Sequence, residues 1–254
     1  MDRFLTGKTA VITGSGRGIG RGIALALAQR GCNVAINYLR KREEAQETVA
    51  ALTAHGVGAV AFKANVGKEE EVRRLVDQAA AHFGSVDIYV ANAASGVLKP
   101  LTEIDNKAWN WSMDINARSI LFGAQAALPY MRQQKWGRIL TISSVGARRV
   151  FPEYGAVGVS KAAVEAVTRY MAVELAKENI IVNCISPGLV ITGALDFFPR
   201  REEMIDHARR HTPSGELITP EAVGEVAAWL CSEAARMIVG QTIEVDGGYS
   251  LLML

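Results

Sequence analysis

Tyr154 and Lys161 are the two residues of this chain best suited to giving a proton to a reacting oxygen. A free tyrosine titrates near pH ~10, so at neutral pH it holds a proton that it can donate. A nearby ammonium stabilises the tyrosinate left behind and lowers the barrier to that transfer. Six residues separate the pair, and the position four before the lysine is Val157, which has no proton to give.

The spacing of this pair favours one kind of reduction over another. In a helix, Tyr154 would lie ~4.5 Å farther along the axis than position 157, at ~1.5 Å per residue. When a ketone is reduced, the oxygen that needs the proton is bonded to the carbon that receives the hydride. When an enoyl thioester is reduced, the hydride reaches C3 and negative charge collects on the thioester oxygen, three bonds away. A displaced tyrosine suits the second geometry.

Small and polar residues follow two predicted strands and could complete a reaction site. Ser144, ten residues before Tyr154, could donate a hydrogen bond to a developing oxyanion. The stretch from Asn92 to Gly96 leaves room for a ribose and a nicotinamide, although it could also be a plain turn. The histidines have no nucleophile partner and no metal-ligand spacing, so we expect no metal site and expect these four at the surface: His55, His82, His207 and His211.

A glycine-rich segment, TGSGRGIG (Thr13–Gly20), follows the first predicted strand and opens the first predicted helix. A tight turn at this point lets backbone N–H groups and a helix N-terminus meet a pyrophosphate. Gly14, Gly18 and Gly20 stand where side chains would block that approach. The segment therefore indicates a dinucleotide site, because a strand precedes it and a helix follows it.

The charges around the second predicted strand favour NADPH over NADH. An NAD-preferring site usually has an acid at the end of this strand, and no acid occurs from Asn33 to Arg42. Arg17 lies inside the glycine loop, and Arg40 and Lys41 follow the strand, where they could hold a 2′-phosphate. Asn65 and Val66, after the third strand, are either an adenine contact or a turn.

Short β-branched runs alternate with helical stretches along the whole chain. This pattern predicts a single doubly wound Rossmann-type α/β domain over residues 1–254, with about seven parallel strands and helices on both faces. The strands are expected at Thr9–Gly14, Asn33–Tyr38, Ala59–Val66, Asp87–Ala94, Arg138–Ser144, Ile180–Ser186 and Gln241–Gly248. Clear helices are expected at Gly18–Arg30, Glu43–His55 and Glu69–Phe83. Irregular sequence from Thr192 to Pro220 is typical of a substrate lid.

The composition is that of an ordinary globular protein. A formal net charge of +2 is too small to indicate a nucleic-acid or membrane partner. Three isolated cysteines, Cys32, Cys184 and Cys231, favour a reducing compartment. The first eight residues are too short and too charged for a signal peptide, and no apolar run approaches the ~18 residues of a membrane span. We therefore expect a cytoplasmic protein.

These motifs together resemble the short-chain dehydrogenase/reductase superfamily along the whole chain. The resemblance rests on TGSGRGIG, NAASG, Asn116 in WNWSMDINA, the Tyr154/Lys161 pair, the Pro187-Gly188 turn and the late VDGG. Tyrosine, six residues, lysine is the pattern of the enoyl-acyl-carrier-protein reductase branch. The three-glycine loop with Arg17 is similar to the NADPH-dependent, type III bacterial form of that branch.

The resemblance implies NADPH-dependent reduction of trans-2-enoyl-acyl carrier protein in fatty-acid biosynthesis by a homotetramer. Tyr154 would be the proton donor or oxyanion stabiliser, Lys161 its electrostatic partner and a ribose ligand, and Ser144 the family serine. Asn116 would be a helix-kink asparagine that supports the lysine through water, and residues 193–216 a mobile lid. The substrate would meet Ser95, Leu195, Phe197 and Phe198. The cofactor would meet Gly14, Ser15, Arg17, Gly18, Ile19, Gly20, Arg40, Lys41, Asn65, Val66, Asn92, Ala93, Ala94, Tyr154, Lys161, Pro187, Gly188, Ile191 and Thr192.

Several alternatives stay open at this level. A 3-oxoacyl-carrier-protein reductase or a sugar dehydrogenase would share the cofactor residues but would normally carry a tyrosine where Val157 stands. A non-catalytic NADPH sensor would explain the missing tyrosine at position 157, because the fold alone does not guarantee activity. The thioester could be carried by coenzyme A, because the arginines of the lid are balanced by its acids. The apolar ending SLLML (Ser250–Leu254) fits either a subunit interface or a packed tail.

Overall fold

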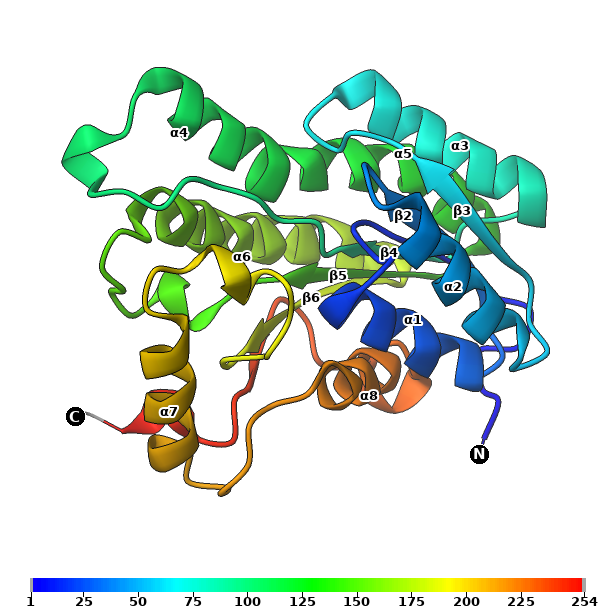
Figure 1. Ribbon diagram of the computed structural model, residues 1–254. Coiled ribbons are helices and arrows are strands. Elements are labelled where there is room, and N and C mark those ends of the chain that lie inside the picture. Colours follow the sequence, from blue (N-terminus) through cyan, green and yellow to red (C-terminus); the bar gives the residue numbers. More distant parts are fainter. Residues whose placement is uncertain (1, 253–254) are drawn as a thin grey trace.

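The computed structural model describes residues 2–252, and within them seven parallel strands form a single sheet (Figure 1). The order is β3-β2-β1-β4-β5-β6-β7. The strands are β1 (Thr9–Ile12), β2 (Asn33–Tyr38), β3 (Ala59–Lys63), β4 (Ile88–Ala91), β5 (Gly137–Ile142), β6 (Ile180–Pro187) and β7 (Thr242–Val245). Every predicted strand is present: five are one to four residues shorter than predicted, β2 has the predicted bounds, and β6 is one residue longer. The predicted fold class is confirmed.

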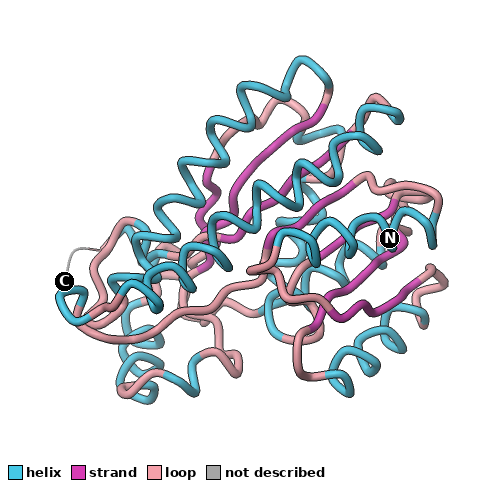
Figure 2. The backbone as a smooth tube through the Cα atoms, turned by 90° about the horizontal axis from the view of Figure 1, so that it is seen from above, coloured by secondary structure: helices cyan, strands magenta, loops and turns pink. Residues whose placement is uncertain are grey.

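Helices cover both faces of this sheet, as Figures 1 and 2 show. The elements are α1 (Gly18–Gln29), α2 (Arg42–Thr53), α3 (Glu69–Phe83), α4 (Asn106–Met113), α5 (Ser119–Gln134), α6 (Gly155–Leu175), α7 (Arg201–His211) and α8 (Pro220–Leu230). Residues of α1, α2 and α8 share one hydrophobic core, and residues of α3, α5 and α6 share the other. The sheet is therefore the middle layer of three.

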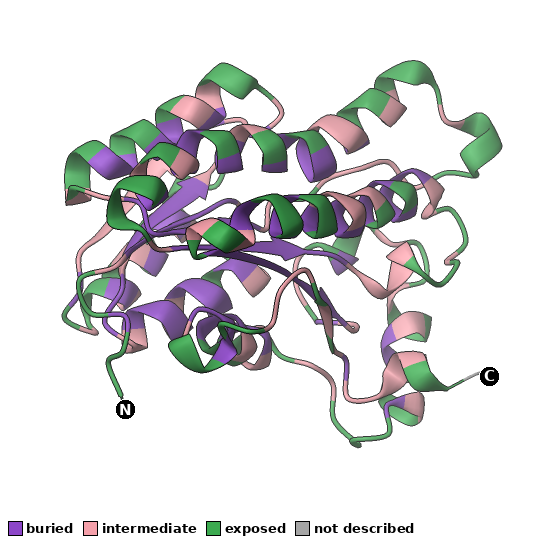
Figure 3. Cartoon of the chain, turned by 180° about the vertical axis from the view of Figure 1, so that it is seen from behind, coloured by how far each residue is buried: buried purple, intermediate pink, exposed green. Residues whose placement is uncertain are grey.

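The alternation of strand side chains explains why the strands read as apolar throughout. In β1, Ala10 and Ile12 face the core with α1, whereas Val11 faces the core with α5. Because both faces are covered, both sets are mostly apolar. Figure 3 shows the result, with the inner strands buried between helices whose outer sides are exposed.

The strand order reverses between β1 and β4, which brings two loops together. The chain runs from β1 outward to β2 and β3 and then crosses to β4 on the other side of β1. The Asn92 amide, just after β4, donates to the carbonyls of Thr13 (2.9 Å) and Gly14 (3.0 Å), just after β1. Such a switch point is where ligands of open α/β sheets bind.

The late segment is more regular than predicted from its sequence. Thr192–Pro220 contains a 3₁₀ turn at Leu195–Phe197 and the helix α7, so the prediction of an irregular stretch is wrong for these residues. Glu202 and Glu203 lie in the first turn of α7 and three bases lie in its last turn, which suits the helix dipole.

No helix within residues 2–252 is long and apolar enough to cross a membrane. The apolar ending is described only to Leu252, with Leu251 and Leu252 exposed. Met253 and Leu254 lie outside the described residues.

Two helices on one face pack backbone against backbone. A Cβ at Gly22 in α1 would collide with the carbonyl of Pro220, and a Cβ at Gly224 in α8 would collide with the carbonyl of Gly22. This contact holds α1, which starts at the glycine loop, against α8, which follows the late segment.

We predict that Gly22→Val destabilises the protein by about 1–3 kcal/mol, because added atoms force the backbones of α1 and α8 apart. Urea denaturation measures the free energy of unfolding. Arg21→Ala, an exposed change one residue away, is the control and should stay within about 0.5 kcal/mol. Equal stability of Gly22→Val and the parent would contradict the close contact.

Candidate active site

A pocket of about 1610 Å³ opens at the carboxyl ends of the strands, between the sheet and the late segment. The structure brings most of the predicted site residues to it. They are Gly14, Arg17, Gly18, Ile19, Gly20, Arg40, Lys41, Asn65, Val66, Asn92, Ala93, Ala94, Ser95, Ser144, Tyr154, Lys161, Pro187, Gly188, Thr192, Leu195, Phe197 and Phe198. Three predicted residues are not among those that line this pocket: Ser15, Asn116 and Ile191.

Ser15 and Ile191 lie outside the lining for different reasons, and Asn116 is described below. The Ser15 hydroxyl is buried, donates to the Ile12 carbonyl (2.6 Å) and accepts from the Asn37 N–H (3.1 Å). Ile191 is 41% exposed, and its neighbours Val190 and Thr192 line the pocket in its place. Ser15 therefore supports the glycine loop from within instead of facing a ligand.

The glycine loop presents backbone donors to the pocket. Gly14 and Gly18 have φ values of 62° and 56°, in the left-handed region that favours glycine. A Cβ at Gly20 would lie 2.6 Å from the Gly14 carbonyl oxygen. No side chain within residues 2–252 caps α1, so its first N–H groups remain available. The arrangement fits a pyrophosphate.

Three cations surround the next part of the pocket, together with one acid that the sequence analysis did not identify. The Glu44 carboxylate lies 3.6 Å from Arg17 Nε and 3.4 Å from Lys41 Nζ, and Arg40 also lines the pocket. Glu44 is in the first turn of α2, where an acid is ordinarily explained by the helix dipole. Its position between the two cations could not be predicted from the sequence.

Lys161 is buried at the end of β5. Its ammonium donates to the Ile142 carbonyl at 2.7 Å, and burial lowers the pKa of Lys161 to about 8. Ser144 follows two residues after Ile142, and its hydroxyl accepts from the Gly146 N–H at 3.1 Å. The ammonium, which comes from α6, and the serine hydroxyl, which follows β5, therefore reach the pocket at the same strand end.

Tyr154 stands immediately before α6, at its N-cap position. Burial raises the pKa of the Tyr154 phenol, and the nearby Ser144 hydroxyl acts in the opposite direction. A Cβ at Gly146 would lie 2.5 Å from the Tyr154 ring. The Phe198 ring lies 5.9 Å from the Tyr154 ring, between centroids, so the late segment packs against this side chain. The phenol is thus protonated at neutral pH and enclosed.

Val157 does not occupy the position that a more closely spaced donor would need. Its side chain is buried and packs where a Cβ of Gly96 would be. Gly96 lines the pocket, whereas Val157 is not among the lining residues. At the start of α6, Tyr154 is therefore the side chain that can give a proton to a bound molecule.

Asn116 lies in a π-helical segment, Asp114–Arg118, between α4 and α5. Its amide accepts from the Ser95 N–H and donates to the Ser95 carbonyl and to the Ser160 hydroxyl, each at 2.8 Å. The irregular helix geometry agrees with the predicted kink. Asn116 joins the strand-exit loop to the residue before Lys161, and its predicted support of the lysine through water stays a prediction.

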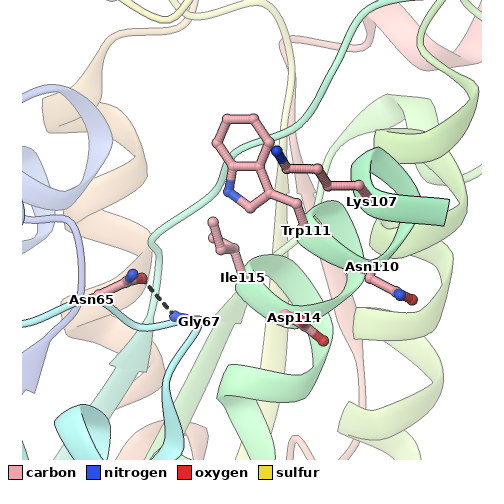
Figure 4. Close-up of a pocket in the computed structure, with 7 residues that line it drawn as sticks. All are labelled: Asn65, Gly67, Lys107, Asn110, Trp111, Asp114 and Ile115. Carbon is pink, nitrogen blue, oxygen red and sulfur yellow. Dashed lines mark hydrogen bonds between the residues drawn. The ribbon is translucent and has the colours of Figure 1, made fainter. Parts of the chain in front are cut away.

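Asn65 is used by a turn. Its side-chain oxygen accepts from the Gly67 N–H at 3.0 Å, which Figure 4 shows beside a smaller pocket of about 360 Å³. Asn65, Trp111 and Ile115 line both pockets. The turn and the pocket position are both present, so the two alternatives for Asn65 do not exclude each other.

The expectation that the histidines lie at the surface is wrong for His207. This residue of α7 lines the pocket, and its Nδ1 lies 3.1 Å from the Tyr249 hydroxyl. Tyr249 lines the pocket as well, although it lies near the end of the chain. Nothing local in the sequence brings residues 207 and 249 together, because the contact arises only when the late segment folds. Within residues 2–252, no group of three or more His, Cys, Asp or Glu side chains is placed to hold a metal ion.

We predict that Lys161→Met raises the free energy of unfolding relative to the parent protein, and that this gain is larger at neutral pH than at alkaline pH. Because the folded pKa is about 8 and the ordinary value 10.5, the unfolded chain holds the lysine proton over this interval and the folded chain does not. The stability of the parent should therefore rise relative to the variant between pH 8 and 10.5, by up to about 3 kcal/mol. Urea denaturation across this range measures it. With exposed Lys177→Met as control, a constant difference for Lys161→Met would refute the lowered pKa.

Comparison with known proteins agrees with this geometry. Residues 14–250 match the family model described as Enoyl-(Acyl carrier protein) reductase. A hydroxynaphthalene reductase-like protein, Arp2, of Metarhizium robertsii is 39% identical over 97% of this chain and 96% of its own. A 1-cyclohexenylcarbonyl-CoA reductase of Streptomyces collinus is 36% identical over 96% of this chain and 88% of its own. A 7α-hydroxysteroid dehydrogenase solved with NADH and 7-oxo glycochenodeoxycholic acid superposes with a TM-score of 0.90, at 34% identity over 97% of this chain and 96% of its own. The chain belongs to the short-chain dehydrogenase/reductase family and is an oxidoreductase.

Proposed function

We propose that this protein uses NADPH to reduce the trans-2 double bond of enoyl thioesters on acyl carrier protein, in fatty-acid biosynthesis. The position of Tyr154 carries the proposal. Its ring lies in the pocket with Ser144, whereas Val157 packs against Gly96 and leaves no donor at the closer position. An enoyl thioester needs its oxygen stabilised three bonds from the carbon that is reduced, which suits a displaced donor.

The chain's own residues would perform the proton chemistry. When bound, the nicotinamide supplies the hydride. The Tyr154 phenol, protonated at neutral pH because burial raises its pKa, would donate to the thioester oxygen as charge develops there. The Lys161 ammonium would stabilise the tyrosinate, and Ser144 would orient the phenol. Backbone donors of the glycine loop and the start of α1 would hold the pyrophosphate.

The cation cluster supports NADPH over NADH. Arg17, Arg40 and Lys41 line the same part of the pocket, at the end of β2, where a 2′-phosphate would be bound. Arginine can bind phosphate through two parallel hydrogen bonds. Arg17 and Lys41 pair with the Glu44 carboxylate, and a bound 2′-phosphate would have to take the place of that carboxylate as their partner.

The late segment provides an apolar wall for an acyl chain. Leu195, Phe197 and Phe198 line the pocket, and Phe198 packs on Tyr154. Residues 193–216 would thus form the substrate lid. Phe197 is 77% exposed, which leaves an apolar ring available to a long substrate.

The relatives support two kinds of substrate. The name of the Streptomyces reductase indicates a double bond conjugated to a thioester, as in the proposed reaction. The bound 7-oxo steroid of the solved dehydrogenase indicates a carbonyl, so reduction of a 3-oxo thioester or another ketone is the second candidate. Coenzyme A could replace the carrier protein in either case.

The proposal includes a cytoplasmic homotetramer. Leu121 of α5 and Val159, Tyr170 and Val173 of α6 are exposed apolar side chains on neighbouring helices, which a second subunit could cover. The three free cysteines are buried and reduced, in keeping with a reducing compartment.

The deciding experiment offers the purified protein NADPH with a trans-2-enoyl thioester or with a 3-oxo thioester, each on acyl carrier protein and on coenzyme A. We expect NADPH oxidation with the enoyl substrate. We also expect Tyr154→Phe to lower turnover by about a hundredfold or more while NADPH affinity is retained, because only the proton is removed. Tyr130→Phe, a surface tyrosine bonded to Asp77, is the matched control. Oxidation with the 3-oxo substrate alone would establish the second candidate, and none with either would favour a binding protein.

A binding measurement tests the choice of cofactor without any substrate. We predict that Arg17→Ala weakens binding of 2′,5′-ADP by about tenfold to a hundredfold, because it removes charge-assisted hydrogen bonds to the 2′-phosphate. Binding of 5′-AMP should change little. Titration calorimetry compares the two nucleotides, with exposed Arg21→Ala as the control. An equal loss for both would show that Arg17 does not read the 2′-phosphate.

A further inference from the structure

Glu165 is a buried carboxylate that the proposed chemistry does not use. It lies on α6, four residues after Lys161, and its side chain is only 7% exposed. One carboxylate oxygen accepts from the Ser143 hydroxyl at 3.0 Å, and the other accepts from Arg148 Nε at 3.0 Å. Burying a carboxylate is unfavourable unless it is paired and hydrogen-bonded, so both partners are needed to keep it there.

The three residues of this contact belong to the three segments that carry the candidate catalytic residues. Ser143 directly precedes Ser144. Arg148 lies in the loop between Ser144 and Tyr154, residues 145–153, which we call the catalytic loop. Glu165 is one helical turn beyond Lys161, on the same face of α6. A single carboxylate therefore connects the supports of the serine, the tyrosine and the lysine.

Arg148 also connects the catalytic loop to the other side of the pocket. Its Nη1 donates to Glu244 of β7 at 3.0 Å, so one guanidinium is held between two carboxylates. The other Glu244 oxygen accepts from the Ser250 hydroxyl at 2.8 Å, and Arg149 donates to the Ser250 carbonyl at 3.0 Å. Tyr249, the neighbour of Ser250, contacts His207 of α7.

Tyr154 needs such support because α6 holds only one end of it: its carbonyl accepts from the Gly158 N–H at 2.7 Å, while the chain before it lies outside the helix. The residue precedes the first helical residue, Gly155, and the residue before it, Glu153, has a φ of 63°. A left-handed conformation at a residue other than glycine persists only where the surroundings enforce it. The Glu153 carbonyl accepts from the Lys99 N–H at 2.9 Å, which holds one side of the loop. The Arg148 guanidinium holds the other.

We propose that Glu165, Arg148 and Glu244 form a positioning triad that fixes the catalytic loop and so places the Tyr154 side chain in the pocket that Ser144 and Lys161 also line. None of the three is among the residues that line the main pocket, whereas Val145, Phe151 and Tyr154 are. The triad therefore acts on the reaction through the loop and not by touching a ligand. The inference rests on the proposed role of Tyr154.

The test separates turnover from binding and folding. Arg148→Ala should lower kcat by about tenfold to a hundredfold, because a misplacement of about 1 Å is enough for such a loss. Affinity for NADPH, measured by fluorescence titration, should stay within about twofold, since the glycine loop and the cations at the end of β2 are untouched. Arg148→Lys should recover part of kcat, because an ammonium can pair with a carboxylate but lacks the planar fork that reaches two. Glu165→Gln combined with Arg148→Ala should be no worse than Arg148→Ala alone, because both act through one contact.

Arg132→Ala is the matched control, since Arg132 also pairs with a glutamate (Glu178, 2.6 Å) but lies outside the pocket. Should Arg148→Ala fail to fold, Arg148→Lys and Glu244→Gln carry the test, with a predicted severalfold loss of kcat. An unchanged kcat in these variants, or a loss of NADPH affinity equal to the loss of kcat, would overturn the triad. Activity of the parent on a 3-oxo thioester alone would instead refute the enoyl proposal, and the variants would then be assayed on that substrate.

Discussion

The hydrogen bond from the Lys161 ammonium to the Ile142 carbonyl joins helix α6 to the end of strand β5, and the candidate site is arranged around it. The strand stops at that carbonyl, so Ser144 leaves the sheet within reach of the same pocket. Burial lowers the lysine pKa to about 8, which keeps the ammonium charged at neutral pH but makes its proton sensitive to alkali. A cation in this position can act on the tyrosine only if the tyrosine is brought to it.

Tyr154 lies where the catalytic loop joins α6, whereas a donor one turn before the lysine would lie inside the helix. Val157 occupies that closer position and packs against Gly96, where a Cβ would collide with it. The Tyr154 carbonyl accepts from the Gly158 N–H at 2.7 Å, so Tyr154 stands at the helix boundary, with the catalytic loop before it. Its geometry then depends on the left-handed Glu153, the Ser144 contact and the Arg148 pairings.

The substrate side of the pocket is assembled from residues distant in the chain. Phe198 and His207 lie in the late segment, and Tyr249 lies four residues after the end of β7. The Ser214 N–H donates to the Gly247 carbonyl at 3.0 Å, so the segment after α7 and the turn before the tail are also joined.

The sequence by itself determined the architecture, the glycine loop and the tyrosine–lysine pair. These features are local: apolar runs, glycines at a strand exit and fixed spacings follow from backbone geometry and burial, whatever the distant residues are. The tertiary structure alone decided which polar residues face the pocket. The Ser15 hydroxyl is buried, the Glu44 carboxylate lies between Arg17 and Lys41, and His207 contacts Tyr249. It also decided that Glu165 is buried against Arg148, since pairing between residues 17 apart depends on how a loop folds back on a helix and not on any local periodicity.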